Sequence, residues 1–441
     1  MIVATSSSRS SNLMLVDMGK MRHMYFVGIG GIGMSALAQM LVDQGVQVSG
    51  SDREESPVTE LLGSRGTKVD IGQRAEHVSP NMDAVVYSDA VPAENPERVR
   101  AMDLGIPQFS YSQMLGKVSE GKRTLAVAGT HGKTTTTGML ARILRDAGVG
   151  PSAVVGSIVK DFGSNYMSGT SDLFVVEACE YRDHLLELSP YVLVITNLEW
   201  DHTDYFPSLA ALQETFRKAI ARVPVDGAIV TNPNDVNIAP LLAETKARVI
   251  DYTKEPVYAL QLPGEFNSMN ARAAAAAARV VLPPGSDAKI AESLAAFSGT
   301  WRRFEYKGTT SLGAEVYDDY AHHPTAVKVT LKALRAKTPG KIIVAFHPHL
   351  YSRTRDLFEE FATAFSDADR VLIAPIYAAR EKDDGSVSSA MLAERIRANG
   401  TDASALGFDD IEKELREAGR GEVVMTMGAG DIYKIADKIV V

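Results

Sequence analysis

Residues 128–137, Ala-Gly-Thr-His-Gly-Lys-Thr-Thr-Thr-Thr, combine glycines, a lysine and hydroxyl groups at the spacing of a phosphate-binding loop. A short apolar segment, 123–128, precedes them, and apolar residues at helical spacing follow. In such a strand–loop–helix unit the helix N-terminus favours an anion, Lys133 adds a positive charge, and Thr134 can ligate Mg²⁺. The common pattern begins with a glycine where this chain has Val127, so the sequence predicts a shortened variant of the loop.

A second glycine-rich turn, Gly-Ile-Gly-Gly-Ile-Gly at 28–33, follows the apolar segment 24–27. An acid, Asp52, ends the next expected strand about twenty residues further on, as in the dinucleotide-binding fingerprint. Ser88 ends a later strand on the same edge of the expected sheet. The pattern predicts a nucleotide-diphosphate site, which a dinucleotide or the pyrophosphate of a UDP-sugar could occupy.

Two strand ends in the middle of the chain carry acids and a histidine. Glu177 closes the apolar segment 171–176, and Asn-Leu-Glu-Trp-Asp-His at 197–202 follows the segment 191–196. The carboxyl ends of parallel strands meet at one edge of a sheet, so these residues should lie near the phosphate loop. An acid in that place is expected to contact Mg²⁺, and an Asp-His pair can bind a metal or orient a substrate.

Two asparagines begin the alanine-rich segment that contains 273–278. Asn267 could cap the expected helix. Asn270 is then expected to face inward within the first turn, where its amide could contact a nucleotide base or the γ-phosphate.

The C-terminal third of the chain concentrates Arg, His and Tyr after its apolar segments. Trp-Arg-Arg-Phe lies at 301–304, Asp-Asp-Tyr-Ala-His-His-Pro at 318–324, and His-Pro-His-Leu-Tyr-Ser-Arg-Thr-Arg at 347–355. Guanidinium groups are well suited to carboxylates, so this third is predicted to bind a ligand that carries one.

Apolar segments and helical segments alternate along the whole chain, which predicts an α/β fold with mostly parallel sheets. We expect three consecutive domains: Rossmann-like at the N-terminus, P-loop ATPase-like in the centre and Rossmann-like at the C-terminus. The expected boundaries are a flexible leader at 1–20, a nucleotide-diphosphate-binding domain at 21–117, an ATP-binding domain at 118–299 and a carboxylate-binding domain at 300–441.

Length and composition agree with this organisation. A chain of 441 residues exceeds the size of a single core, and a net charge of −9 disfavours a nucleic-acid partner. The single cysteine, Cys179, suits a reducing cytoplasm, and the lack of a long apolar run predicts no membrane insertion. A monomer or a homodimer is expected.

An ATP-type site between a UDP-type site and a carboxylate site indicates ATP-driven ligation. Asn-Pro-Asn-Asp at 232–235 is not a guanine-reading motif, which disfavours a GTPase. A nicotinamide-dependent oxidoreductase would use the turn at 28–33 but leave the loop at 128–137 without a task. A non-catalytic module that binds ATP or a UDP-sugar is a further alternative.

Taken together and in order, these motifs resemble the Mur ligases from about residue 22 to the C-terminus. The resemblance implies a cytoplasmic enzyme of peptidoglycan synthesis that uses ATP and Mg²⁺. The expected reaction joins L-alanine to the carboxylate of UDP-N-acetylmuramate through an acyl phosphate. The motifs do not size the amino-acid pocket, so glycine or serine is an alternative substrate. Leu350 stands where many members carry arginine, which leaves more of the expected charge on Arg353.

The resemblance also implies roles for individual residues. Catalytic roles are expected for Lys133, Glu177, His202 and Arg353. Mg²⁺ ligands are expected to be Thr134, Glu177 and His202. The expected ATP-binding residues are Gly129, Thr130, His131, Gly132, Lys133, Thr134, Thr135, Asn267, Asn270, Arg303, Asp318 and Asp319. The expected UDP-sugar-binding residues are Gly28, Gly30, Gly31, Gly33, Asp52 and Ser88. The amino acid is expected to contact Tyr320, His322, His349 and Arg353.

Overall fold

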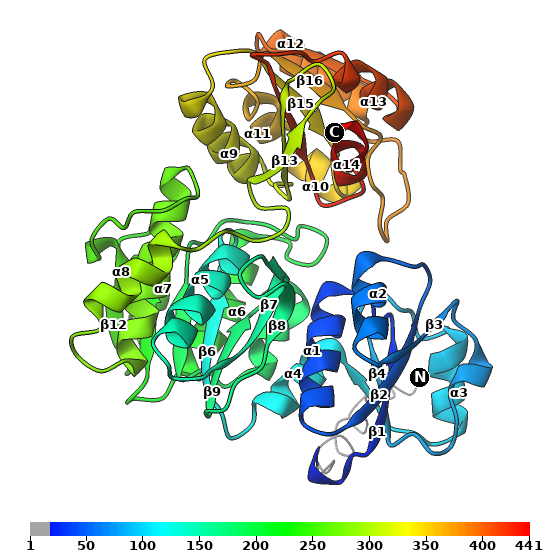
Figure 1. Ribbon diagram of the computed structural model, residues 1–441, viewed down its shortest axis with the longest axis vertical. Coiled ribbons are helices and arrows are strands. Elements are labelled where there is room, and N and C mark those ends of the chain that lie inside the picture. Colours follow the sequence, from blue (N-terminus) through cyan, green and yellow to red (C-terminus); the bar gives the residue numbers. More distant parts are fainter. Residues whose placement is uncertain (1–17) are drawn as a thin grey trace, which may run out of the picture. The chain divides into compact units, whose positions relative to one another are not determined.

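The structure is a computed structural model that describes residues 18–441 (Figure 1). Strands within this range form three sheets, of five, seven and six strands. The chain divides into two compact units, one ending at Glu120 and one spanning Gly121–Val441. Residues 1–17 of the expected leader lie outside the described residues, and Met18–Lys20 form a short 3₁₀ helix.

The first unit is built on a wholly parallel sheet in the order β3-β2-β1-β4-β5. Its strands are β1 (His23–Val27), β2 (Gln47–Asp52), β3 (Lys68–Ile71), β4 (Ala84–Tyr87) and β5 (Gln108–Ser110). Its helices are α1 (Ile32–Asp43), α2 (Pro57–Ser64), α3 (Pro96–Asp103) and α4 (Tyr111–Ser119). The strand order reverses between β1 and β4, which is where ligands bind in sheets of this kind.

The second unit begins with the seven-stranded sheet, in the order β12-β11-β10-β6-β9-β7-β8. Its strands are β6 (Arg123–Ala128), β7 (Ser152–Val159), β8 (Ser164–Met167), β9 (Leu173–Glu177), β10 (Val192–Ile195), β11 (Ala228–Thr231) and β12 (Arg248–Asp251). Its α-helices are α5 (Lys133–Asp146), α6 (Leu209–Ala221), α7 (Glu265–Val281) and α8 (Asp287–Ala295). Only β8 pairs with its neighbour antiparallel among these described strands.

Helices α5 and α7 pack against each other and against one face of this sheet (Figure 1). The alanine run 273–278 of α7 is fully buried, and its small side chains allow α7 to approach its neighbours closely. This contact fixes α5, and therefore the loop that precedes it, against the start of α7.

The second unit continues into a six-stranded sheet, in the order β13-β14-β18-β15-β16-β17. Its strands are β13 (Glu305–Thr309), β14 (Glu315–Asp319), β15 (Ile342–Phe346), β16 (Arg370–Ile373), β17 (Asp402–Ala405) and β18 (Val423–Met427). Its helices are α9 (Pro324–Lys337), α10 (Tyr351–Asp356), α11 (Phe358–Thr363), α12 (Ser389–Ala398), α13 (Phe408–Arg416) and α14 (Tyr433–Ile439).

Helices cover both faces of the six-stranded sheet. Along β15 the side chain of Val344 packs with α9, α11 and α12, whereas its neighbours Ile343 and Ala345 pack with α13 and α14. Successive side chains on a strand point to opposite faces, so a strand buried on both faces must be apolar throughout. The sequence Ile-Ile-Val-Ala-Phe of β15 satisfies this requirement.

The α/β class with mostly parallel sheets is therefore confirmed, whereas the expected boundaries at 117/118 and 299/300 stay predictions. One local expectation is wrong. The cap of α7 is Gly264, and Asn267 lies inside the first turn rather than capping it. No helix in the described range is both long enough and apolar enough to cross a membrane.

Candidate active site

The phosphate loop lies between β6 and α5, as the sequence predicts. Gly132 has a φ of 82°, in the left-handed region, and a side chain there would come within 2.2 Å of Asn270 Oδ1 on α7. Glycine is thus required both by the turn and by the close approach of α7. Gly129, Thr130 and Thr135 lie in the same loop and the first helical turn.

Lys133 is the first residue of α5, and its ammonium lies inside the loop. Nζ donates to Gly129 O at 2.5 Å, to Thr130 O at 3.2 Å and to Glu180 Oε1 at 3.0 Å. Burial by itself would lower the pKa of Lys133, but the carboxylate of Glu180 offsets this effect and the pKa is raised. The lysine therefore stays positively charged at the place where phosphate would bind.

Thr134 and Glu177 meet directly. Thr134 Oγ1 donates to Glu177 Oε1 at 3.0 Å, and the Gly156 N–H donates to Glu177 Oε2 at 2.7 Å. Arg303 Nη2 donates to Thr134 Oγ1 at 3.0 Å, although 169 residues separate the two in the chain. A hydroxyl and a carboxylate in contact beside a phosphate loop are suitable ligands for Mg²⁺.

His202 lies next to a buried acid that the sequence did not single out. His202 Nε2 is 3.4 Å from Glu180 Oε1, and the Glu180 side chain is 1% exposed. Burial would raise the pKa of Glu180, but Lys133 and His202 together lower it, so the carboxylate is ionised. The available signal was its position three residues after Glu177, just past the end of β9.

Arg353, on α10, is buried and already paired. Its Nε and Nη2 each lie 2.8 Å from Asp201 Oδ1, and its Nη1 lies 3.1 Å from His349 Nδ1. Burial would raise the pKa of Asp201, but Arg353 more than offsets this and the pKa is held well below its usual range. Asp201 directly precedes His202, which contacts Glu180 beside Lys133. The ion pair therefore connects Arg353 and the residues around it, the predicted amino-acid-binding residues, to the phosphate loop.

Three aromatic rings lie next to one another beside Arg353, and that of His349 contacts its guanidinium directly. The rings of His349 and Tyr377 are stacked, with centroids 5.4 Å apart, and the ring of His322 lies 6.0 Å from that of His349. His322 Nδ1 is 2.8 Å from Tyr320 O. Burial, reinforced by the charge of Arg353, lowers the pKa of His349 to about 3 and that of His322 well below its usual value. Both rings are therefore neutral near pH 7.

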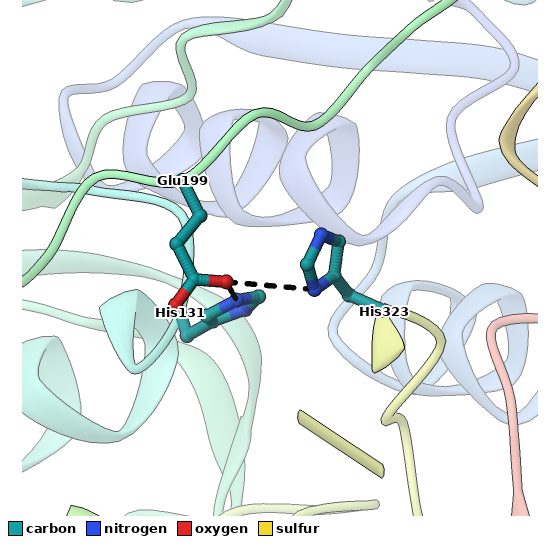
Figure 2. A group of neighbouring side chains, drawn as sticks. All are labelled: His131, Glu199 and His323. Atoms are coloured by element: carbon teal, nitrogen blue, oxygen red, sulfur yellow. Dashed lines mark hydrogen bonds and ion pairs between the residues drawn. The ribbon is translucent and has the colours of Figure 1, made fainter. Parts of the chain in front are cut away.

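His131, Glu199 and His323 form a third cluster (Figure 2). Glu199 Oε2 lies 3.3 Å from His131 Nε2 and 3.8 Å from His323 Nδ1, and it accepts a 2.6 Å hydrogen bond from Thr325 Oγ1. These are ligand types for a transition metal. The polar atoms nevertheless satisfy one another, because His323 Nδ1 also accepts from the Thr325 N–H. The cluster therefore fastens α9 to the phosphate loop.

The two adjacent arginines of the Arg-Arg-Phe motif point to different places. Arg302 is buried with a φ of 58°, and its Nε donates to Asp318 Oδ2 at 2.9 Å. Its Nη groups donate to the carbonyls of Gly428 and Gly430. Arg302 thus holds the loop after β18, while Arg303 reaches Thr134 and lies over the ring of Tyr320 at 4.9 Å.

Asp318 and Asp319 are both buried at the end of β14. The oxygens of Asp318 accept from Arg302 and from Thr426 Oγ1, at 2.6 Å for the threonine. The oxygens of Asp319 accept from the backbone N–H groups of Phe304 and Ala321, each at 2.7 Å. Burial raises the pKa of Asp319 to about 6. Their expected contact with ATP stays a prediction.

The asparagines of α7 are buried beside the loop. Asn267 Nδ2 donates to Pro263 O at 2.7 Å, and Asn270 Nδ2 lies 3.4 Å from Asn267 Oδ1. Asn270 also packs against Gly132, so it is the nearer of the two to the phosphate-binding position.

In the first unit, the predicted UDP-sugar-binding residues lie at the edge of the sheet where the strand order reverses, near the ends of β1, β2 and β4. The Gly30 N–H donates to Asp52 Oδ2 at 2.8 Å. Gly28 has a φ of 81°, and a side chain there would lie 3.3 Å from Ser88 Cβ. A side chain at Gly33 would meet the ring of Tyr111 at 2.7 Å, and Gly31 lies between them at the surface.

Because several buried histidines are neutral, we expect the fold to lose stability as the pH falls. Burial is the main cause that lowers the pKa of His323 and His347 to about 4, and that of His349 to about 3, from an ordinary 6.5. The unfolded chain therefore takes up more protons in this range. The contribution of the neutral rings to stability is complete above about pH 6.5 and is lost progressively as the pH falls toward 4.

We expect the thermal midpoint to be lower at about pH 5 than at about pH 7. His347→Gln removes one of these rings without touching the predicted site residues and should make the drop smaller. An unchanged pH dependence in this variant would contradict the explanation.

The site combines a phosphate loop, buried acids and arginines at the ends of parallel strands. This combination is typical of α/β enzymes that use ATP. Comparisons with known proteins narrow this class. Three family models match the chain: "Mur ligase family, catalytic domain" over residues 23–123, "Mur ligase middle domain" over 127–259, and "Mur ligase, glutamate ligase domain" over 302–430.

Curated relatives and solved structures agree. The UDP-N-acetylmuramate–L-alanine ligases of Clostridium botulinum strain Okra and Acetivibrio thermocellus are each 38% identical, over 95% and 96% of this chain and 97% of theirs. The crystal structure of UDP-N-acetylmuramate–alanine ligase from Thermotoga maritima is 28% identical. It has a TM-score of 0.78 and covers 95% of this chain and 98% of its own. The chain belongs to the Mur ligase family, whose members are ATP-dependent ligases.

Proposed function

We propose that the chain catalyses the ATP-dependent ligation of L-alanine to the carboxylate of UDP-N-acetylmuramate, in peptidoglycan precursor synthesis. The observation that carries the proposal is the continuity between the phosphate loop and the arginine cluster. Lys133 contacts Glu180, Glu180 contacts His202, and Asp201, the residue before His202, is paired with Arg353. One connected site can therefore hold the phosphoryl group to be transferred beside the amino acid that attacks next.

The reaction proceeds in two steps. The muramyl carboxylate attacks the γ-phosphorus of ATP and releases ADP, giving an acyl phosphate. The amino group of L-alanine then attacks the acyl carbon, phosphate leaves from the tetrahedral intermediate, and the amine loses a proton. Lys133 stabilises the negative charge that builds on the transferred phosphoryl group.

The residues present also fit Mg²⁺. Thr134 and Glu177 would hold one ion and Glu177 and His202 another, and Mg²⁺ would supply charge neutralisation on the triphosphate. The buried Oε2 of Glu180, which has no hydrogen-bond partner among the described residues, supports a cation nearby.

The amino-acid cluster fits a small zwitterion. Arg353 would pair with the alanine carboxylate through the remaining Nη2–H, since Nε and Nη2 contact Asp201 and Nη1 contacts both Nδ1 and O of His349. Neutral His322 and His349, with Tyr320, would line the pocket without repelling the alanine ammonium.

The remaining assignments concern nucleotide contacts. For ATP we propose Gly129, Thr130, His131, Gly132, Lys133, Thr134, Thr135, Asn267, Asn270, Arg303, Asp318 and Asp319. For the UDP moiety we propose Gly28, Gly30, Gly31, Gly33, Asp52 and Ser88. ATP and UDP-linked precursors are made in the cytoplasm, so we place the enzyme there, as a monomer or homodimer.

The decisive experiment is phosphate release from ATP with each substrate alone and with both together. We expect sustained release only when UDP-N-acetylmuramate and L-alanine are both present, because the acyl phosphate turns over when the amine attacks it. Parallel reactions with glycine and L-serine test the choice of amino acid. Equal rates with all three would defeat the assignment of L-alanine, and release that ignores the UDP-sugar would defeat the reaction itself.

A further inference from the structure

Glu180 is a buried acid of the site to which the sequence motifs give no task and the proposed reaction gives no ligand role. It follows β9 at the start of a 3₁₀ segment, Tyr181–Glu187, in which Arg182 and Asp183 have left-handed backbone angles. Its side chain is 1% exposed. Oε1 contacts Lys133 Nζ at 3.0 Å and His202 Nε2 at 3.4 Å, whereas Oε2 is buried and has no partner among the described residues.

A buried carboxylate oxygen without a partner is costly, at roughly 1–3 kcal/mol or more, so its retention indicates a partner during function. Solvent water is not the simplest candidate, because Oε2 is shielded from solvent. The neighbouring groups are an ammonium, an imidazole nitrogen and, through Thr134, the carboxylate of Glu177. The carboxylate oxygens and the imidazole nitrogen are suitable ligands for a divalent cation, whereas the protonated ammonium is not a ligand but the positive charge that holds this place in the structure.

The charges around Glu180 also favour a divalent cation at this place. Lys133 and Arg303 bring two positive charges to the two negative charges of Glu177 and Glu180, so these four groups balance one another in the structure. A triphosphate brings more negative charge to the same place. When the Lys133 ammonium turns to the phosphate oxygens, Glu180 loses its counter-ion and would be left as a buried, unpaired charge, which is strongly unfavourable. A divalent cation in the place of the lysine would restore the pairing.

We propose that Glu180, together with His202, is a ligand of the second divalent cation, and that Glu180 exchanges Lys133 for this cation when the nucleotide binds. The inference rests on the proposed function, because it takes the nucleotide to be ATP. It adds a residue to the reaction and gives a reason why the lysine and an acid are buried together.

The alternative role for Glu180 is purely that of a counter-ion for Lys133. The two roles differ in what Glu180→Gln does to the metal. Glutamine keeps the size of the side chain but removes the charge that would bind a cation. If Glu180 only neutralised Lys133, the number of bound cations and their affinities would stay the same.

The test counts Mn²⁺ ions bound by the full chain in the presence of a non-hydrolysable ATP analogue, by electron paramagnetic resonance. We expect two ions per wild-type chain. In Glu180→Gln the second ion should bind at least about tenfold more weakly. The matched control is Asp161→Asn, another buried carboxylate, which lies 2.7 Å from Arg142 and away from the loop. This control should bind both ions as the wild type does.

Equal stoichiometry and affinity in Glu180→Gln and wild type would overturn the inference. If Glu180→Gln unfolds, Glu180→Asp serves instead, because it keeps the charge but shortens the side chain. Weaker binding of the second ion alone would support the proposal. Unchanged binding of both ions would reject it. The measurement uses neither L-alanine nor the UDP-sugar. A chain that binds two ions through Glu180 but forms no product would therefore refute the proposed reaction and leave this inference standing.

Discussion

Replacing Lys133 by methionine should reduce phosphate release by roughly 10³-fold or more, the largest effect expected of any single substitution. The ammonium lies inside the phosphate loop, held by the carbonyls of Gly129 and Thr130 and by Glu180. Methionine keeps the volume of the chain but cannot stabilise charge on the transferred phosphoryl group. Steady-state phosphate release with saturating substrates measures the effect.

A loss of stability could imitate this result, because Lys133→Met leaves Glu180 as a buried, unpaired carboxylate. Breaking a buried pair in this way costs about 3–5 kcal/mol. The double variant Lys133→Met/Glu180→Gln removes both charges and should recover most of the stability while remaining inactive. Lys289→Met, at an exposed position on α8, is the control for methionine substitution and should behave as the wild type. Activity that returns together with stability would reject a catalytic role for Lys133.

Much of the fold could be predicted because its causes are local. Apolar segments of strand length, each followed by a turn and an amphipathic helix, favour parallel sheets whatever the rest of the chain does. Residues at strand ends, such as Glu177 and His202, were also predictable, because parallel strands bring their carboxyl ends to one edge. The contact between Glu177 and Thr134 follows from this geometry.

What could not be predicted depends on side-chain direction in irregular segments. Arg302 and Arg303 are adjacent and identical in type, yet a left-handed backbone at Arg302 directs it into the protein and leaves Arg303 facing Thr134. Glu180 lies beyond the end of β9, where no periodicity states which way a side chain points. Its role depends on Lys133, 47 residues earlier in the chain. Such pairings become visible only when the sheets are assembled.

The paired state of Arg353 changes what its substitution should do. The family resemblance predicts that Arg353 contacts the amino-acid carboxylate, and the structure buries its guanidinium against Asp201 and His349. Arg353→Met therefore removes a substrate contact and also leaves Asp201 as a buried, unpaired charge. The second effect alone costs about 3–5 kcal/mol of stability. The informative variant is therefore the double substitution Arg353→Met/Asp201→Asn, which removes the pair as a whole.

In this double variant we expect the KM for L-alanine to rise roughly 10- to 100-fold, the equivalent of one lost hydrogen-bonded charge contact of about 1.5–3 kcal/mol. The KM for ATP should change little, because the phosphate loop and Thr134 do not contact Arg353. L-alaninamide, which lacks the carboxylate, separates binding from positioning. If Arg353 binds the carboxylate, the wild type prefers L-alanine over the amide and the variant loses that preference. Two results would contradict this role: a variant that still prefers L-alanine over L-alaninamide but turns over slowly, or a rise in the KM for ATP alone. Either would show that Arg353 holds Asp201 beside His202 and does not contact the amino acid.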